Sequence, residues 1–588
     1  MSKSYRNPIK LNYFLLFVCF VLFSCQNPKR DPFYNLREAK GHYHYGGIFQ
    51  YSETENFRNL YPLNTIDGIS HRIIRNIYEG LIRFSSSDLS PQPSIAEKWE
   101  ANEDGTIFTF HIRKGVYFHD DPCFDGGEGR EVNAHDVKYC FDKLCEADAN
   151  NQGFWVFKDR VKGANMYFQR SRQNELTEGG VEGVQVIDDY TIQIELVRPF
   201  AGFLNLLGTP FTYIFPKEAI EKYNAQGMRD KCVGTGPFIL KAVNSNESII
   251  LIRNEKYWDE DELRNQMPYL DAIKVQFIFD KKAELLEFHK GNLDMAVPLE
   301  LKDALKEHVR SYELGASQFE LQTAPSLSVQ FLRFLHTSEV FKTKEVRKAF
   351  NLAIDKSKIA LYVLQGEGNA ANNGFVPPFF KNYDASSVQG NIFNPEKARE
   401  LLSKAGYHEG KGFPSIILHV TGRERDQEVA SIVQKMLKDN LNIRIKIVTL
   451  PLAQLIENFE TGKSLFWISR WGADYPDPEN FLNLFHGAHI PTDDLQKSHL
   501  NSERYFNYEF DSLLDLANRT IDVENRFKLY QQADQLLMED AVMIPLFYTE
   551  NYRLIKPYVK NFEINGMDYR DFRTVYFERD DLAVTAED

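Results

Sequence analysis

Helical and strand-like segments alternate through the second half of the chain, and this alternation limits the possible folds more than any other feature of the sequence. Helical spacing of apolar residues occurs at 346–354, 356–364, 395–405, 427–437 and 452–459, with strand-like runs at 415–420 and 443–449. This order is typical of a sheet that is covered by helices. The sequence therefore predicts an α/β fold for this half of the chain.

The first half mixes sheet and helix. Strand-like runs at 48–52, 81–84, 97–100 and 107–112 precede a predicted hairpin at 184–187 and 191–196. Ile69 to Leu81 has helical spacing, and Asn133 is expected to cap the helix that follows it. Gly234 and Gly236 predict a tight turn before a strand, because glycine permits backbone angles that are closed to other residues.

The first 25 residues have the order of an export signal. Three cations (Lys3, Arg6 and Lys10) precede the apolar run 13–23, which is short for a membrane span, and the segment 22–25 has the form of a bacterial lipobox. We expect residues 1–24 to be a signal peptide, Cys25 to be acylated, and residues 25–44 to form a lipidated N-terminus and polar tether. Cleavage elsewhere stays open because Phe23 is bulky for its position.

Composition and motifs exclude several classes of function. The chain has 588 residues and a formal net charge of −14, which argues against nucleic acid as a partner. It contains neither a Gly-x-Ser-x-Gly elbow nor a His-Glu-x-x-His zinc helix, so we expect no enzyme activity, no metal and no cofactor. The pairing of the cysteines beyond Cys25 in the mature chain stays open: Cys123, Cys140, Cys145 and Cys232.

An acidic and aromatic turn follows the apolar run Leu465 to Ile468. Two prolines at 476 and 478 cannot lie inside a helix or a central strand, so the strand must end before them and leave Asp474 at its mouth. Trp467, Trp471 and Tyr475 lie nearby in sequence, and aromatic rings around a fixed carboxylate form a receptor for an ammonium group. The alternative is that these rings belong to the core and that Asp474 is a solvated turn residue.

Several segments, in order along the chain, resemble one known family. They are 76–82, 94–99, 108–120, 133–137, 234–238, 346–350 with 353–355, and 394–398. Together they resemble the bacterial extracellular solute-binding proteins of family 5, which include the dipeptide and oligopeptide receptors of ABC importers. The resemblance runs from about Tyr45 to Tyr576.

The resemblance implies an α/β fold with two lobes that close on a ligand, as in periplasmic binding proteins. It also implies a discontinuous first lobe. Lobe I would comprise residues 45–320, including an extra subdomain at about 79–190, and lobe II residues 321–543. Residues 544–588 would return to lobe I and end in an acidic tail.

The resemblance further implies a binding site. Asp474 matches the family's Trp-x-x-Asp pattern and would hold the α-ammonium group of a peptide. Main-chain groups near Asp67, Gly68 and Ile69, and at Arg470, Trp471 and Gly472, would pair with the ligand as an added strand does. Some members place an arginine three residues before the tryptophan, where this chain has Ile468, so the ligand length stays open.

The expected function is capture without chemistry. A monomeric receptor, held by its lipid on a bacterial membrane and facing the periplasm or the cell surface, would bind peptides and deliver them to an ABC permease and its ATPase. Alternatives that stay open are a sensing or surface lipoprotein without an importer, a binder of a non-peptide solute on the same fold, and a hydrolase.

Overall fold

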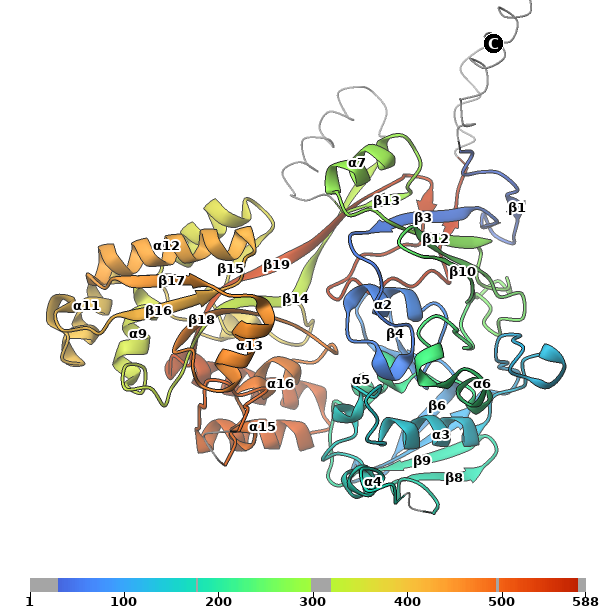
Figure 1. Ribbon diagram of the computed structural model, residues 1–588, viewed down its shortest axis with the longest axis horizontal. Helices are drawn as coiled ribbons and strands as arrows, with labels where there is room; N and C mark the ends of the chain where they lie inside the picture. Colours follow the sequence, from blue (N-terminus) through green and yellow to red (C-terminus); the bar gives the residue numbers. More distant parts are fainter. Residues whose placement is uncertain (1–29, 176–177, 298–318, 493–495, 580–588) are drawn as a thin grey trace, which may run out of the picture.

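The computed structural model of the chain describes residues 30–175, 178–297, 319–492 and 496–579. The predicted signal peptide, Cys25 and the first residues of the predicted tether lie outside the described residues. The described chain forms two bodies. Two long strands, β14 (Glu320–Phe334) and β19 (Met543–Ile555), run between them (Figure 1).

The first body contains two four-stranded sheets that share one apolar core. One sheet has the order β10 (Phe238–Asn244), β11 (Ser248–Arg253), β12 (Ala272–Phe277) and β3 (Ile48–Glu53). The other has the order β6 (Ala96–Ala101), β7 (Ile107–Ile112), β9 (Thr191–Glu195) and β8 (Val184–Asp188), with α3 (Ala134–Leu144) and α4 (Ala164–Ser171) beside it (Figure 1). Phe49 of β3 and Phe110 of β7 are fully buried in the same cluster.

Two predictions from short stretches of sequence in the first body are confirmed. Asn133 caps α3: its Oδ1 accepts a hydrogen bond from His135 N at 2.9 Å, and Asp136 accepts one from Asn133 N at 3.0 Å. The predicted hairpin at 184–196 is present as β8 and β9.

The four cysteines whose pairing the sequence left open are free thiols: Cys123, Cys140, Cys145 and Cys232.

The helix predicted at 69–81 is too long, since α2 spans Gly68–Ile74. The next turn cannot continue the helix because its carbonyls bond elsewhere. Asn76 O accepts a hydrogen bond from Phe238 N, and Ile77 O accepts one from Gly236 N, both at 2.9 Å. Each carbonyl is therefore paired with another part of the chain instead of with a later N–H of the helix.

The turn at Gly234 and Gly236 forms, but the predicted reason is wrong. Neither glycine has a positive φ. A Cβ atom at Gly234 would lie 2.1 Å from Ile77 O, and one at Gly236 would lie 2.7 Å from the same oxygen. Glycine is required here because two main chains approach closely, not because of an unusual backbone angle.

The second body is built on a seven-stranded sheet, as the alternation predicts. The strand order is β13 (Met295–Ala296), β19, β14, β18 (Phe466–Gly472), β16 (Ile416–Val420) and β17 (Ile445–Thr449), with β15 (Gly368–Ala370) paired to β19. The predicted helices are α9 (Lys344–Ala353), α10 (Lys356–Ile359), α11 (Pro395–Lys404), α12 (Glu424–Leu441) and α13 (Leu452–Glu460).

Helices cover both faces of this sheet. Leu332 and Phe331 are neighbours on β14 and point to opposite faces. Leu332 packs in a cluster with residues of α9, α11 and α12, whereas Phe331 packs in a cluster with residues of α15 (Tyr508–Arg519) and α16 (Val523–Glu539). The sheet is thus buried on both sides, which agrees with its apolar strands.

Ten further α-helices and strands complete the described chain. They are β1 (Arg37–Glu38), β2 (His44–Tyr45), β4 (Ile82–Phe84), β5 (Pro91–Pro93), α5 (Phe203–Leu207), α6 (Lys217–Gly227), α7 (Lys281–His289), α14 (Glu479–Leu482), β20 (Val559–Lys560) and β21 (Tyr576–Phe577). In the described ranges, no helix has both the length and the apolar composition needed to cross a bilayer.

The pairing of the two long strands is interrupted at two places, between Pro325 and Val329 and between Gln330 and Phe331. Glu320 to Pro325 pairs with Glu550 to Ile555, and Val329 to Arg333 pairs with Met543 to Tyr548. Residues 326–328 of β14 therefore face the single residue Thr549 and form a bulge. The bulge separates the stretch of β14 that pairs with the end of β19 next to β13 from the stretch that lies between β19 and β18.

We expect Gly234→Ala to destabilise the first body. The added methyl group would clash with Ile77 O. Overpacking of this kind lowers the free energy of unfolding by about 1–3 kcal/mol. Thermal and urea unfolding should show a lower midpoint for this variant. Gly422→Ala is the matched control because a Cβ at Gly422 meets no atom within 4 Å. Equal midpoints for both variants would contradict the close-approach explanation.

Candidate functional site

One edge of β18 is open over most of its length. β18 pairs with β14 from Phe466 to Gly472, but on its other edge it pairs with β16 only at Phe466 and Trp467. From Ile468 to Gly472 this edge has no strand beside it in the described chain. An open edge of this kind can accept an extended chain as a further strand.

The main-chain groups of Arg470 and Gly472 face the open edge. Ala473 N donates to Leu327 O at 2.9 Å, so the groups of Ala473 point toward the segment that continues β14. Successive residues of a strand direct their N–H and C=O groups to alternate edges. The groups of Arg470 and Gly472 consequently point away from β14, as the resemblance implies, whereas those of Trp471 point toward it.

Asp474 lies two residues beyond the end of β18, and Asn480 holds it there. Asn480 Oδ1 accepts hydrogen bonds from Asp474 N at 3.2 Å and from Trp471 Nε1 at 3.0 Å. Asn480 is a buried residue of α14. One amide side chain therefore fixes both the acidic residue and the indole ring beside it.

The carboxylate of Asp474 is open to solvent but closely surrounded by protein. Its side chain is exposed, yet burial by the surrounding protein raises its pKa to about 6 against an opposing hydrogen bond from Asn480. Both observations fit a group on the wall of a concave site. Among the described residues, no Arg, Lys or His lies within ion-pair distance of Asp474, so its charge is available to a cation from outside.

The aromatic residues near Asp474 differ in accessibility. Trp471 is half-buried beside Asp474. Trp467 is fully buried and stacks on Phe459 at 5.7 Å, and Tyr475 is buried in the core of the first body, stacked on Trp155 at 6.2 Å. Contact of Trp467 or Tyr475 with a ligand stays a prediction, and both rings are closed to solvent in this structure.

Of three arginines near the open edge, Arg470 was predicted to bind through its main chain, whereas Arg423 and Arg425 were not singled out from the sequence. Burial and the nearby guanidinium groups of Arg423 and Arg425 lower the pKa of Arg470. Arg425 pairs with Glu367, whereas in the described chain Arg423 and Arg470 pair with no carboxylate. Arg423 and Arg425 stand at the start of α12, directly after β16, so only the register of β16 beside β18 could have shown that they approach Arg470.

The predicted residues of the first body lie at the start of α2, on the side of that body nearer to the second body in Figure 1. Asp67 caps this helix: Oδ1 accepts from Ser70 N at 2.9 Å, and Oδ2 accepts from Ser70 Oγ at 2.7 Å. The N–H groups of Gly68 and Ile69 have no acceptor in the described chain, as expected for a first helical turn. The main chain here, not the Asp67 carboxylate, is free to bind.

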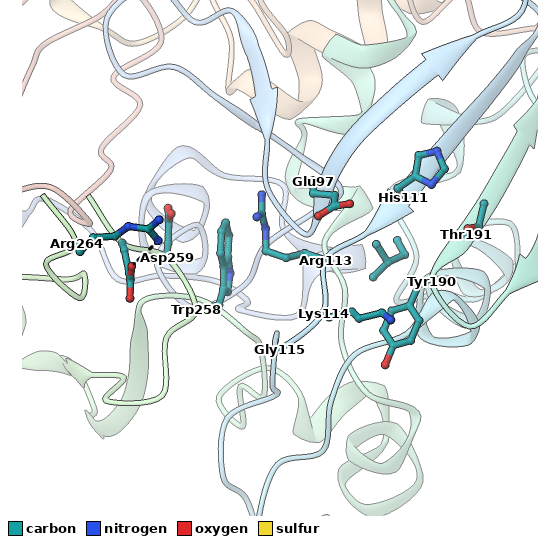
Figure 2. A pocket seen from close by; sticks show the side chains of 12 residues that line it. Glu97, His111, Arg113, Lys114, Gly115, Tyr190, Thr191, Trp258, Asp259 and Arg264 are labelled. Carbon is teal, nitrogen blue, oxygen red and sulfur yellow. Dashed lines mark hydrogen bonds and ion pairs between the residues drawn. The ribbon is translucent and has the colours of Figure 1, made fainter. Parts of the chain in front are cut away.

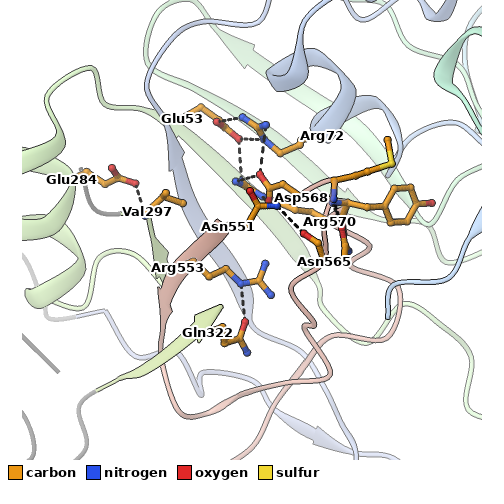
Figure 3. Close-up of polar contacts among 12 residues, drawn as sticks. Glu53, Arg72, Glu284, Val297, Gln322, Asn551, Arg553, Asn565, Asp568 and Arg570 are labelled. Carbon is orange, nitrogen blue, oxygen red and sulfur yellow. Dashed lines mark hydrogen bonds and ion pairs between the residues drawn. The ribbon is translucent and has the colours of Figure 1, made fainter. Parts of the chain in front are cut away.

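A network of ion pairs anchors α2 to the rest of the first body (Figure 3). Arg72 of α2 lies 2.6 Å from Glu53 of β3 and 3.6 Å from Asp568, and Arg570 joins the same two carboxylates at 3.0 and 2.8 Å. Burial alone would raise the pKa of Asp568, but Arg570 and Arg72 outweigh it and lower this pKa to about 2. Asp568 therefore stays ionised to a lower pH than Asp474 does, and it holds the helix in position.

One pocket lies elsewhere on the first body. A pocket of about 740 Å³ on the first body is lined by none of the predicted site residues (Figure 2). Among the described residues, no group of three or more His, Cys, Asp and Glu side chains could hold a metal ion.

Comparison with known proteins identifies the family. The family described as bacterial extracellular solute-binding proteins, family 5 Middle, matches residues 90–491, which is more than half of the chain. The chain belongs to this family.

Individual relatives agree with this assignment. The chain is 29% identical to heme-binding protein A of Haemophilus influenzae, over 87% of this chain and 89% of the relative. It is 27% identical to the dipeptide-binding protein DppE of Bacillus subtilis, over 86% and 88%. A solved periplasmic binding protein, DppA of Helicobacter pylori in complex with the peptide STSA, matches with a TM-score of 0.72 and 25% identity, covering 91% of this chain and 99% of that one. The predicted two-lobed α/β fold is confirmed.

We expect the carboxyl group of Asp474 to titrate near pH 6 in the ligand-free protein. Asn480→Ala removes a hydrogen bond that lowers this pKa, so the pKa should rise above 6 in the variant. Carbon NMR of protein labelled at the aspartate carboxyl carbons measures both values, and the spectrum of Asp474→Asn assigns the signal. A titration near pH 4 in both proteins would contradict the surrounded carboxylate.

Proposed function

We propose that this chain is a lipid-anchored receptor outside the cytoplasm that captures peptides between its two bodies and delivers them to an ABC importer. The observation that carries the proposal is the open edge of β18, which ends beside a carboxylate without an internal cation. Backbone and amino terminus are the two features that all linear peptides share. A site that recognises both can bind peptides of different sequence.

The peptide would lie as an added strand along β18. Main-chain groups of Arg470 and Gly472 would pair with its backbone, and Asp474 would accept its α-ammonium group. The accessible face of Trp471 would cover this end of the ligand. The free N–H groups of Gly68 and Ile69 would bind from the first body, so that the ligand itself joins the two bodies.

The arginines supply a counterpart for the other end of a peptide. Arg423 and Arg470 are cationic and unpaired in the described chain, and a guanidinium group binds a carboxylate through two parallel hydrogen bonds. A short peptide would then have its ammonium group at Asp474 and its carboxylate near these arginines. A longer peptide would extend past them.

Closure would use the strands that join the bodies. The predicted lobes, residues 45–320 with 544–588 on one side and 321–543 on the other, meet at β14 and β19. The bulge at 326–328 is a point at which these strands can bend. The proposed action is binding without chemistry, by a monomer that needs no metal or cofactor.

The anchor and the delivery step complete the proposal. Acylated Cys25 would hold the protein on the membrane. The tether would be shorter than the predicted segment 25–44, because Arg30 pairs with Asp294 at 2.8 Å and β1 pairs with β2 on the first body. A closed receptor would then dock on a permease whose ATPase drives import. A sensing lipoprotein of the same fold is the alternative for this step. The relative named heme-binding protein A makes haem the competing class of ligand.

Asp474→Asn should weaken the binding of peptides that have a free amino terminus by about tenfold or more, because a charge-assisted hydrogen bond is worth roughly 1.5–3 kcal/mol. Calorimetry with a set of short peptides measures the effect. N-acetylated peptides should bind the wild type and the variant equally weakly, and Glu428→Gln, an equal charge change at an exposed position of α12, should leave affinity unchanged.

One outcome would contradict the role of Asp474, and another would contradict peptides as the class of ligand. One is an Asp474→Asn variant with unaltered affinity for free-amino peptides. The other is a wild-type protein that binds haemin but no peptide of the set.

The mature chain should begin at Cys25 and carry acyl groups there. Mass spectrometry of the N-terminal peptide from membrane-extracted protein measures this directly. Incorporation of labelled palmitate should disappear in Cys25→Ala and persist in Cys19→Ala, which removes a cysteine of the predicted signal peptide. An unmodified N-terminus at another residue would refute the lipid anchor but not the peptide site.

A further inference from the structure

The pocket of about 740 Å³ is an open groove on the first body (Figure 2). Its lining comes from four places in the chain. Glu97 lies on β6, Arg113 and Lys114 follow the end of β7, Tyr190 lies in the hairpin between β8 and β9, and Trp258 follows β11. The groove therefore runs between the second sheet of the first body and the loop that leaves the first sheet.

Two cations in this groove lie on aromatic rings. The guanidinium carbon of Arg113 lies 4.3 Å from the centre of the Trp258 ring, and Lys114 Nζ lies 4.8 Å from the centre of the Tyr190 ring. A ring face attracts a cation without neutralising it. Each cation is thus held in position while its full charge remains available.

The two rings are themselves fixed by hydrogen bonds. Trp258 Nε1 donates to Glu79 Oε2 at 3.0 Å, and Glu79 is buried. Tyr190 Oη donates to Glu131 Oε2 at 3.3 Å. The groove consequently presents Arg113 and Lys114 in a prepared geometry, which reduces the entropy lost when a ligand binds.

The acidic groups around the groove do not neutralise these cations. Asp259 is paired with Arg83 at 2.7 Å and with Arg573 at 2.8 Å, and Glu260 is paired with Arg264 at 3.3 Å.

Within the described residues, neither Arg113 nor Lys114 has a carboxylate within ion-pair distance, and the side-chain hydrogen bond of Arg113 runs from Nε to Ser94 O. Both Nη groups of Arg113 point to no acceptor in the described chain. Glu97 is the one lining carboxylate that is also unpaired there, so the unpaired groups of the groove carry a net positive charge.

We propose that this groove binds an acidic peptide segment of a partner protein. Its volume lies in the range of about 300–1,000 Å³ that holds molecules of many atoms, so it is large for a single inorganic anion. Adjacent cations suit carboxylates of successive acidic side chains, and Arg113 can bind one of them through two hydrogen bonds. The unpaired Glu97 can accept an N–H of the same segment. The groove is separate from Asp474 and β18 and does not depend on the function proposed there.

A blocked peptide tests this proposal without filling the other site. Hexaglutamate with an acetylated amino end and an amidated carboxyl end has no ammonium group for Asp474. It should bind the full-length wild type at low salt, in fluorescence anisotropy, and more weakly as salt screens the charges. Blocked hexaglutamine should bind at least tenfold more weakly than hexaglutamate.

Matched variants connect the binding to the groove. Arg113→Ala with Lys114→Ala should weaken hexaglutamate binding at least tenfold, whereas Asp474→Asn should leave it unchanged. Lys231→Ala with Lys241→Ala removes two exposed cations of the first body outside the groove and should also leave it unchanged. Circular dichroism confirms that each variant is folded.

Three results would overturn the proposal. They are no binding of hexaglutamate by the wild type, equal binding of hexaglutamine, and full displacement by millimolar inorganic phosphate, which would identify a site for small anions. A groove variant that loses hexaglutamate but keeps free-amino peptides separates this site from the one at Asp474.

Discussion

The pairing of β14 with β19 is the constraint on which the rest of the structure depends. Every passage of the described chain between the two bodies runs through these strands, and Arg553 of β19 donates a hydrogen bond to Gln322 of β14 at 2.8 Å where they leave the second body (Figure 3). The bulge at 326–328 lies beside the end of β18, since Ser328 is paired with Gly472. The joint between the bodies and the candidate site are therefore built from directly paired residues.

The surroundings of Asp568 and Asp474 explain why the first has a structural role and the second a proposed binding role. Asp568 lies between Arg72 and Arg570, which keep it ionised and tie α2 to the body. Asp474 has surrounding protein but no internal cation, and its pKa is raised. A carboxylate that is already paired gives little to a ligand, whereas one that is surrounded and unpaired gains most from an added ammonium group. The same reasoning separates Arg423 and Arg470 from Arg425, whose charge is taken by Glu367.

Sequence patterns predicted what depends on neighbours along the chain and missed what depends on distant ones. The alternation beyond Val346, the cap at Asn133 and the strand end before Asp474 are local, and the structure has all three. The length of α2 and the role of Gly234 depend on Ile77 meeting a segment far away in sequence. The burial of Trp467 and the open edge of β18 depend on the packing of α13 and on where β16 diverges, which no local spacing encodes. The aromatic and acidic turn suggested an ammonium ligand for Asp474, and the family resemblance made that ligand the amino end of a peptide.

The position of β14 and β19 in the chain also has a consequence for biosynthesis. The second body is an insertion, so the first body is interrupted after its early strands and completed by residues near the other end of the chain. Phe49 of β3 packs with Phe562, Phe572 and Phe577 in one buried cluster. During vectorial synthesis the early sheets must remain without these rings while more than two hundred residues of the second body are made, as the separation of β14 from β19 requires. The second body can then fold first and present β14 and β19 as a paired template, on which the first body closes last.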